Sequence, residues 1–257
     1  CDWSSDVCSS DLRAAVRRLL DAGVEAIAVC FLWSFRHPEH ERRVKAIVQE
    51  MAPHVFVSCS VDLAPKWGEY ERTTAAVLNA YIGPITARYL GNLDQELKRL
   101  GYRQPLQITQ CGGGSISVDK AMESPLLTLD SGPVSGVTGS LYLGKVMGCP
   151  NIITTDMGGT SFDVSLVAGG KPRLAAQTSI DFGLTIRTPM IEITTIGAGG
   201  GSVARVDASG LLQVGPESAG SDPGPACYGA GGERPTVTDA NVVLGRIDAG
   251  RPIGGRL

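Results

Sequence analysis

The stretch 152–167 constrains the fold more than any other part of the chain, because an acid, paired glycines and hydroxyls lie between two apolar runs. The β-branched residues 152–155 favour a strand, residues 156–160 interrupt it, and residues 162–167 favour a second strand. The sequence therefore predicts a strand, a glycine turn and a returning strand.

This turn has two interpretations. Gly158 and Gly159 would let backbone N–H groups approach phosphate oxygens without obstruction by a Cβ atom, and the Asp156 carboxylate could hold Mg²⁺, mostly through water. The same pattern is also typical of an ordinary β-hairpin in which the glycines supply positive φ angles. The stretch by itself leaves both interpretations open.

Composition narrows the class of partner. A chain of 257 residues that is 43% hydrophobic and 19% charged can bury one large or two modest cores, and we expect two. The net charge of -3 gives no basic footprint, which argues against nucleic acid and membrane surfaces and favours small ligands. No apolar run approaches the roughly 20 residues that span a bilayer. We therefore predict a cytoplasmic protein.

The pattern of the seven cysteines also favours the cytoplasm. They are scattered, odd in number and free of any CxxC or Cys/His cluster, so they indicate reduced thiols rather than a disulfide framework or a zinc site. No Ser-His-Asp set, HExxH helix or Walker sequence is present, and the catalytic residues stay unassigned.

The chain divides into three predicted regions. Residues 1–11 fit neither helical nor strand periodicity and lack an initiator Met, so we interpret them as a non-native scar. Residues 12–147 are expected to be the C-terminal part of a first α/β domain with an inter-domain helix, and residues 148–257 the start of a second domain.

Apolar periodicity predicts alternating helices and strands. We expect Pro84 to kink or divide the helical region 69–100, and its charged residues Glu69, Glu71, Arg72, Lys98 and Arg99 to form a solvated face. The other predicted helices are 12–22, 38–51, a short one from Ser117, 131–147 and one opened by Thr238 and Asp239, and the predicted strands are 26–31, 55–58, 106–110, 126–129, 191–196 and 203–206, with 214–232 irregular.

Two further glycine clusters are candidate ligand-facing loops. Residues 112–114 follow a predicted strand, and three consecutive glycines, Gly199, Gly200 and Gly201, precede Ser202. Three glycines in a row seldom serve a core, although a flexible hairpin would also explain them. Asp239 is a good helix N-cap, and capping alone would account for it.

Several separated stretches resemble the hydantoinase A/oxoprolinase family, whose members include N-methylhydantoinase, 5-oxoprolinase and subunits of acetone and acetophenone carboxylases. The stretches that carry the resemblance are EYERT at 69–73, VLNAY at 77–81, SGP at 131–133, DMGGTSFDV at 156–164, GAGGGS at 197–202, GPESAG at 215–220 and TVTDAN at 236–241. They extend over nearly all of the chain from Leu12 onward.

The resemblance implies an α/β fold of actin-like ATPase type, in which two ribonuclease-H-like domains close over Mg-ATP. The family's first phosphate turn, an acid followed by Gly-Gly-Thr, does not occur here, so the first domain is expected to be incomplete and the chain an internal fragment. Such a fragment is expected to be inactive and to bind ATP poorly. Cys111 and Gly112 also replace the family's usual Ser-Asn before Gly-Gly.

The resemblance also implies site roles. The implied contacts to ATP are Gly158, Gly159, Thr160 and Ser161 in the phosphate turn, with Gly199, Gly200, Gly201 and Ser202 as a pocket wall. Asp156 would be directed at Mg²⁺. The roles of Asp163 and Asp239 stay open.

The implied activity is the opening of a cyclic amide, a hydantoin or 5-oxoproline, by ATP-driven phosphorylation of the substrate, together with a hydantoinase B-type partner subunit or region. One alternative is a subunit of an ATP-dependent carboxylase acting on a ketone such as acetone or acetophenone. Another is a non-catalytic actin-like nucleotide-binding module, since one fold can serve several functions.

Overall fold

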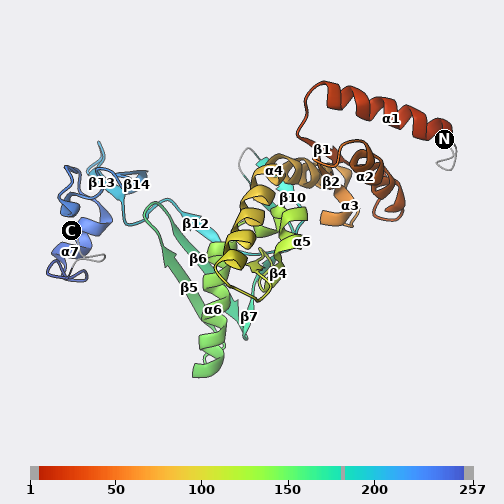
Figure 1. Cartoon of the computed structure of the whole chain (residues 1–257). Coiled ribbons are helices and arrows are strands. Elements are labelled where there is room, and N and C mark those ends of the chain that lie inside the picture. Colours follow the sequence, from red (N-terminus) through yellow and green to blue (C-terminus); the bar gives the residue numbers. More distant parts are fainter. Residues whose placement is uncertain (1–5, 181–182, 252–257) are drawn as a thin grey trace. The chain divides into compact units, whose positions relative to one another are not determined.

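The computed structural model describes residues 6–180 and 183–251 and has the element order labelled in Figure 1. The chain forms two compact units. The first contains residues 1–135 and 174–191, and the second contains residues 136–173 and 192–257. Among the described residues, no helix is long and apolar enough to cross a membrane.

A parallel pair of strands forms the centre of the first unit. β1 (Ala26–Val29) pairs with β2 (Phe56–Cys59), and α2 (Glu39–Met51) provides the crossover that parallel strands require. Pro38 lies just before α2, and Val44 and Val48 from its apolar face are buried. These strands and helices agree with the predicted α/β pattern to within one or two residues at most ends.

The first helix, α1 (Asp6–Asp21), begins six residues earlier than predicted. Residues 6–11, which lack a helical pattern in the sequence, therefore form the start of the helix whose apolar stripe begins at Leu12. Val16 from this helix is buried in the core formed with β1, β2 and α2. The interpretation of residues 1–11 as a non-native scar stays a prediction.

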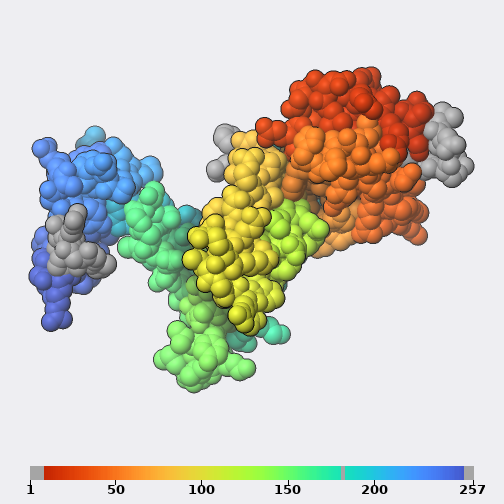
Figure 2. Space-filling view, viewed as in Figure 1, coloured from red at the N-terminus to blue at the C-terminus, as the bar shows by residue number. Residues whose placement is uncertain are grey.

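α4 (Glu69–Arg99) runs through Pro84 as one helix, so of the two expected effects of this proline the division is wrong, and the kink stays a prediction. Just before the proline, Gly83 lies against the ring of Phe56, and a Cβ atom there would overlap that ring. This close packing of the helix on β2 helps to offset the hydrogen bond that proline removes. α4 also contacts α5 (Val118–Glu123), and in Figure 2 the two helices lie against each other.

The helix ends where the sequence predicts. Gly101 has a φ of +90°, and the N–H of Tyr102 donates to the carbonyl oxygen of Leu97 at 2.9 Å. This pairing is a Schellman-type cap, in which glycine accommodates the left-handed conformation.

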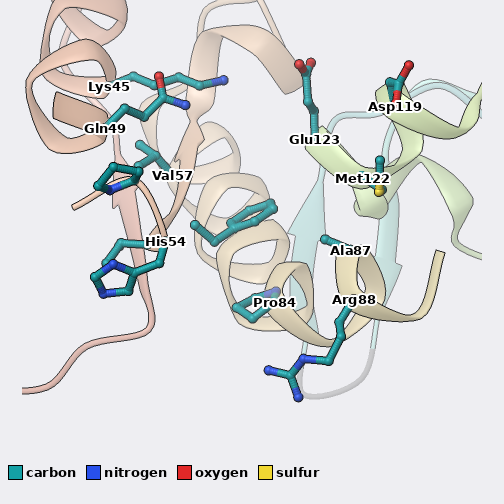
Figure 3. Close-up of a pocket in the computed structure, with 13 residues that line it drawn as sticks. Lys45, Gln49, His54, Val57, Pro84, Ala87, Arg88, Asp119, Met122 and Glu123 are labelled. Carbon is teal, nitrogen blue, oxygen red and sulfur yellow. The ribbon is translucent and has the colours of Figure 1, made fainter. Parts of the chain in front are cut away.

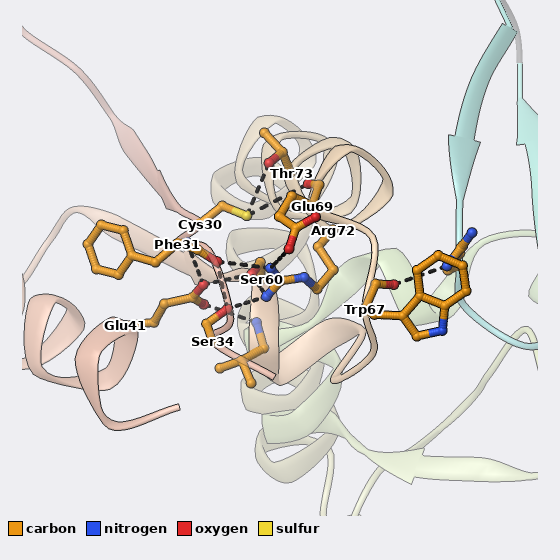
Figure 4. Close-up of polar contacts among 11 residues, drawn as sticks. Cys30, Phe31, Ser34, Glu41, Ser60, Trp67, Glu69, Arg72 and Thr73 are labelled. Atoms are coloured by element: carbon orange, nitrogen blue, oxygen red, sulfur yellow. Dashed lines mark hydrogen bonds and ion pairs between the residues drawn. The ribbon is translucent and has the colours of Figure 1, made fainter. Parts of the chain in front are cut away.

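Arg72 is fully buried, so the prediction that it belongs to a solvated face is wrong (Figure 4). Its guanidinium donates to the hydroxyls of Ser34 and Ser60 and to the carbonyl oxygen of Phe31. Glu41, also fully buried, accepts from the Ser60 hydroxyl at 2.7 Å and from the Phe31 N–H at 2.9 Å. The shared serine and backbone partners allow both charges to be buried.

The expected strand at 126–129 is also wrong. This segment is a 3₁₀ helix, η1 (Pro125–Thr128), in which the N–H of Leu126 donates to the side-chain oxygen of Asn79. The rest of the first unit consists of α3 (Ser60–Leu63), β3 (Gln107–Thr109), β4 (Ser115–Ser117), β8 (Leu174–Ala175), β9 (Thr178–Ile180), β10 (Leu184–Ile186) and β11 (Met190–Ile191). Residues 112–114 form the turn between the antiparallel strands β3 and β4.

In the second unit, β5 (Ile152–Met157) and β6 (Phe162–Ala168) form an antiparallel hairpin, and β12 (Thr194–Ile196) pairs with the other edge of β6. β7 (Lys171–Pro172) pairs antiparallel with the last residues of β6. The predicted strand 191–196 is therefore divided between β11 and β12. α6 (Ser131–Met147) has its predicted bounds.

The C-terminal part contains a second hairpin, β13 (Ser202–Val206) and β14 (Leu212–Ser218), followed by the 3₁₀ helix η3 (Ala226–Tyr228) and α7 (Val237–Val243). The expectation that residues 214–232 are irregular is wrong for β14. Gly and Pro in this strand coincide with a shift of register between β13 and β14.

Candidate functional site

The glycine turn lies at the tip of the β5–β6 hairpin. Met157 pairs with Phe162, and the N–H of Gly158 donates to the carbonyl oxygen of Ser161 at 2.9 Å. The predicted strand, turn and returning strand are confirmed. This geometry is common to both interpretations of the turn.

The backbone donors of the turn are available to a ligand. Within the described part of the chain, the N–H groups of Gly159, Thr160 and Ser161 have no hydrogen-bond acceptor. Three successive N–H donors without a protein partner are the kind of donors that bind an anion. In an ordinary hairpin the same N–H groups would bond to water, so the two interpretations differ in whether an anion replaces that water.

The second glycine segment is engaged differently. The N–H groups of Gly199, Gly200 and Gly201 donate to the carbonyl oxygens of Thr160, Gly158 and Gly159, at 3.2, 2.9 and 2.6 Å. All three donors are therefore used within the protein. They hold the back of the turn rather than facing a ligand.

This close contact explains why glycines occupy the segment. A Cβ atom on Gly199 would lie 2.6 Å from the backbone nitrogens of Thr160 and Ser161. A Cβ atom on Gly201 would lie 3.0 Å from the carbonyl oxygen of Gly159. By contrast, a Cβ atom on Gly159 would meet nothing within 4 Å.

The start of α7 supports the glycine segment from its other side. The N–H and the hydroxyl of Thr238 both donate to the carbonyl oxygen of Gly200 at 2.8 Å. Thr236 is the N-cap of α7, and Asp239 completes a capping box, so Asp239 lies at the third helical position rather than at the predicted cap.

Asp239 also joins α7 to η3. Its carboxylate accepts from the N–H groups of Cys227 and Thr236, each at 2.7 Å. Burial raises the pKa of Asp239, but the hydrogen bonds from Cys227 and Thr236 outweigh burial and hold it below its usual value. Burial and the hydrogen bond to Asp239 raise the pKa of the Cys227 thiol to about 11.

A pocket of about 650 Å³ opens beside the glycine turn. Of the predicted residues, Gly158, Gly159, Thr160, Gly200 and Gly201 line it, whereas Asp156, Ser161, Gly199 and Ser202 do not. The lining that the site predictions did not include is Met157, Ser218, Gly220, Ser221, Pro225, Tyr228, Thr238, Asn241 and Ile247.

Ser202 has no path to the pocket. Its side chain is fully buried, and its hydroxyl lacks a hydrogen-bond partner in the described structure. Four of the nine pocket residues that were missed, Ser218, Gly220, Thr238 and Asn241, come from the stretches 215–220 and 236–241. The signal that could have found these four is the Ser, Thr and Asn content of two stretches that also carry the family resemblance.

Two carboxylates face each other across the hairpin. Asp156 is exposed and pairs directly with Asp163, so both side chains lie on the same face. Asp163 accepts from the Thr195 hydroxyl of β12 at 2.6 Å. Among the described residues, no three His, Cys, Asp or Glu side chains gather as a metal cluster.

Comparison with known proteins places this geometry in context. The hydantoinase/oxoprolinase family pattern matches residues 72–253, and the pattern of that family's N-terminal region matches residues 2–52. The chain is 42% identical over 246 residues to the caprolactamase alpha subunit of Pseudomonas jessenii, which covers 96% of this chain and 35% of that protein.

A carboxylase subunit is equally similar. Identity to the acetophenone carboxylase gamma subunit of Aromatoleum aromaticum is 42% over 253 residues, covering 96% of this chain and 34% of that protein. The crystal structure of the ATP-dependent caprolactamase from Pseudomonas jessenii superposes with a TM-score of 0.78 at 40% identity and covers 96% of this chain and 36% of that one. The chain thus spans about a third of the length of these relatives.

Proposed function

Because this chain belongs to the hydantoinase/oxoprolinase family, we propose that it is part of an ATP-dependent enzyme that opens a cyclic amide. Its α/β architecture is shared with the solved caprolactamase, as the resemblance to actin-like ATPases implied. In this proposal the pocket of the second unit holds the phosphate groups of ATP.

One observation carries the proposal. The N–H groups of Gly159, Thr160 and Ser161 are unpaired in the described structure, at a turn held rigid from behind by Gly199 to Gly201. Phosphoryl transfer requires positioning and charge neutralisation more than covalent help from the protein. Fixed backbone donors supply both without a cost of rearrangement.

We assign Asp156 to Mg²⁺. An exposed carboxylate opposite Asp163 provides hard oxygen donors at the end of the hairpin. Mg²⁺ is commonly held by one or two carboxylates, with water and phosphate oxygens completing its coordination. The donor set therefore fits this ion, whose charge would reduce the repulsion between the two carboxylates and balance the phosphates.

The proposed reaction couples ATP to water addition. Transfer of the γ-phosphoryl group of ATP to the amide oxygen would release ADP and make the carbonyl carbon a better target for water. After water adds, the ring C–N bond breaks and the phosphoryl group leaves as inorganic phosphate. The carbonyl carbon ends as a carboxylate and the ring nitrogen as an amine. The name of the relative, caprolactamase, describes an enzyme that acts on a cyclic amide.

A ketone carboxylase is the second candidate. The acetophenone carboxylase subunit is as similar to this chain as the caprolactamase subunit, at 42% identity. Phosphorylation of the carbonyl oxygen would activate a ketone as well as an amide. Both relatives are named as subunits, and we propose a hydantoinase B-type partner subunit or region and a cytoplasmic location for this protein as well.

The test uses the full-length protein that carries this segment, together with its partner. ATP hydrolysis is measured with caprolactam, 5-oxoproline and hydantoin, and with acetone or acetophenone in the presence and absence of bicarbonate. Stimulation by a cyclic amide without bicarbonate supports the first proposal, whereas bicarbonate-dependent stimulation by a ketone supports the second. Asp156→Ala should abolish turnover in either case, and retained turnover would remove Asp156 from the metal site.

A further inference from the structure

A separate groove lies in the first unit, between α2, β2, α4 and α5 (Figure 3). Its volume is about 550 Å³, within the range of about 300–1,000 Å³ that small-molecule sites occupy. The consecutive residues Val55, Phe56 and Val57 all line it. Because successive strand residues point to opposite faces, this lining means that the groove follows the edge of β2.

The floor of the groove is apolar and firmly placed. Phe56, Pro84, Ala87 and Met122 contribute carbon surface to it. The ring of Phe56 rests directly on Gly83, where a Cβ atom would overlap it. An aliphatic chain lying on this floor would gain favourable burial of apolar surface.

The two sides of the groove carry opposite charge. Lys45 extends from α2 on one side, and Asp119 and Glu123 extend from α5 on the other, as Figure 3 shows. Within the described ranges, Lys45 and Asp119 take part in no ion pair, and the Glu123 carboxylate lies 3.8 Å from the Lys120 ammonium. Arg88 of α4 also lines the groove, and Figure 3 shows its guanidinium extending away from the α5 carboxylates. The groove therefore offers Lys45 and the α5 carboxylates on opposite sides of an apolar floor.

We propose that this groove binds a zwitterionic amino acid with an aliphatic body. The ligand carboxylate would pair with Lys45, its ammonium group with Asp119 and Glu123, and its methylene groups would cover Phe56. A ligand with only one charged end would satisfy one side of the groove and leave the other unmatched.

This class of ligand matches the product of the proposed reaction. Opening a cyclic amide with water breaks the ring C–N bond and leaves a carboxylate and an amine on one carbon chain, which is an amino acid of this kind. The groove would then be a product-binding site, an interpretation that rests on the proposed function. The binding itself rests only on the groove.

The experiment is a ¹⁵N-HSQC titration of the 257-residue chain with 6-aminohexanoate, with hexanoate and hexylammonium as matched probes that each lack one charged end. We expect 6-aminohexanoate to shift the amides of Val57, Ala87 and Met122 with a Kd on the order of 1 mM. The single-charge probes should bind more weakly by roughly twofold to fivefold, the ratio expected for one exposed ion pair.

Charge variants assign the two sides. Lys45→Gln should weaken binding of 6-aminohexanoate and hexanoate but leave hexylammonium unchanged, and Asp119→Asn should do the reverse. Arg234→Gln, in the second unit and in an ion pair with Glu217, is the control and should change neither. Asp119 is exposed and Lys45 is half-buried, and unchanged spectra away from the groove would show that both variants fold.

The proposal is overturned if the groove amides do not shift, or if the three probes bind equally and the variants have no effect. Failure of the proposed function would look different. In that case the amides of the glycine turn would not shift on addition of phosphate, or cyclic amides would not stimulate ATP hydrolysis by the full-length enzyme. The groove amides could still shift with 6-aminohexanoate.

Discussion

The two glycine segments of the second unit have similar composition and different roles. The turn Gly158 to Ser161 keeps three backbone N–H groups unpaired and has open space around Gly159. The segment Gly199 to Gly201 uses all three of its N–H groups on the carbonyl oxygens of the turn and has no room for side chains. In the first segment glycine leaves the backbone open, which is the basis for the proposed phosphate contact, and in the second it allows close packing.

The largest expected effect tests this contrast directly. Gly199→Ala should destabilise the second unit by about 3 kcal/mol, since the added methyl group meets backbone atoms that cannot move aside easily. Gly159→Ala is the matched control and should change stability by less than about 0.5 kcal/mol. Hydrogen exchange of the β5 and β6 amides measures both, and equal effects would remove the distinction.

The support behind the second segment should be sensitive to acid. The lowered pKa of Asp239 means that its contribution to stability is fully present above about pH 4, the ordinary value for Asp. This contribution is lost as the pH falls through the lower pKa of the folded state. Asp239→Asn should cost about 1–2 kcal/mol at neutral pH.

In that variant the free energy of unfolding should also fall less as the pH is lowered. Urea denaturation from pH 3 to pH 7 measures this change. Glu233→Gln offers a control at an exposed acid in which no such change is expected. If the free energy of unfolding of Asp239→Asn fell with acid as steeply as that of the parent chain, the Asp239 carboxylate would not anchor α7.

A smaller effect is expected where one hydrogen bond to the segment is removed. Thr238→Val deletes the hydroxyl that donates to the Gly200 carbonyl oxygen but keeps the backbone donor. We expect a loss of about 1 kcal/mol in the free energy of unfolding. Thr160→Val, a change of the same shape in the exposed turn, should leave stability unchanged, and a comparable loss there would contradict the assignment of Thr160 to the ligand side.

The smallest effect concerns the turn hydroxyls. Thr160→Ala, at a turn residue that lines the pocket, should leave stability unchanged and weaken pyrophosphate binding by about two- to fivefold, the loss of one hydrogen bond in a partly exposed site. Isothermal titration calorimetry of the variant and the parent chain measures this ratio. Unchanged affinity would limit phosphate recognition to the backbone.

Local patterns predicted much of the fold. The apolar face of residues 39–51, the cap at Gly101 and the hairpin around residues 158–161 depend on neighbours in sequence, and the structure confirms them. Arg72 was misassigned because its burial depends on Ser34 and on Glu41, 31 residues away, which no local pattern reveals.

The candidate site shows the same limit. The sequence identified both glycine segments, but it assigned them one purpose, the contact with ATP. The difference between them arises from the pairing of Gly199 with Thr160, which lies 39 residues earlier and becomes visible only when the chain folds. The part of the pocket that comes from Tyr228 and Asn241 depends in the same way on the packing of α7 and η3.

The measurement that tests the central claim most directly is a ¹⁵N-HSQC titration of this chain with pyrophosphate. We predict progressive shifts of the Gly159, Thr160 and Ser161 amides, while the amides of Gly199 to Gly201 keep their positions because their N–H groups remain bonded to the turn. Shifts confined to Gly199 to Gly201, or none in either segment at saturating pyrophosphate, would contradict the account.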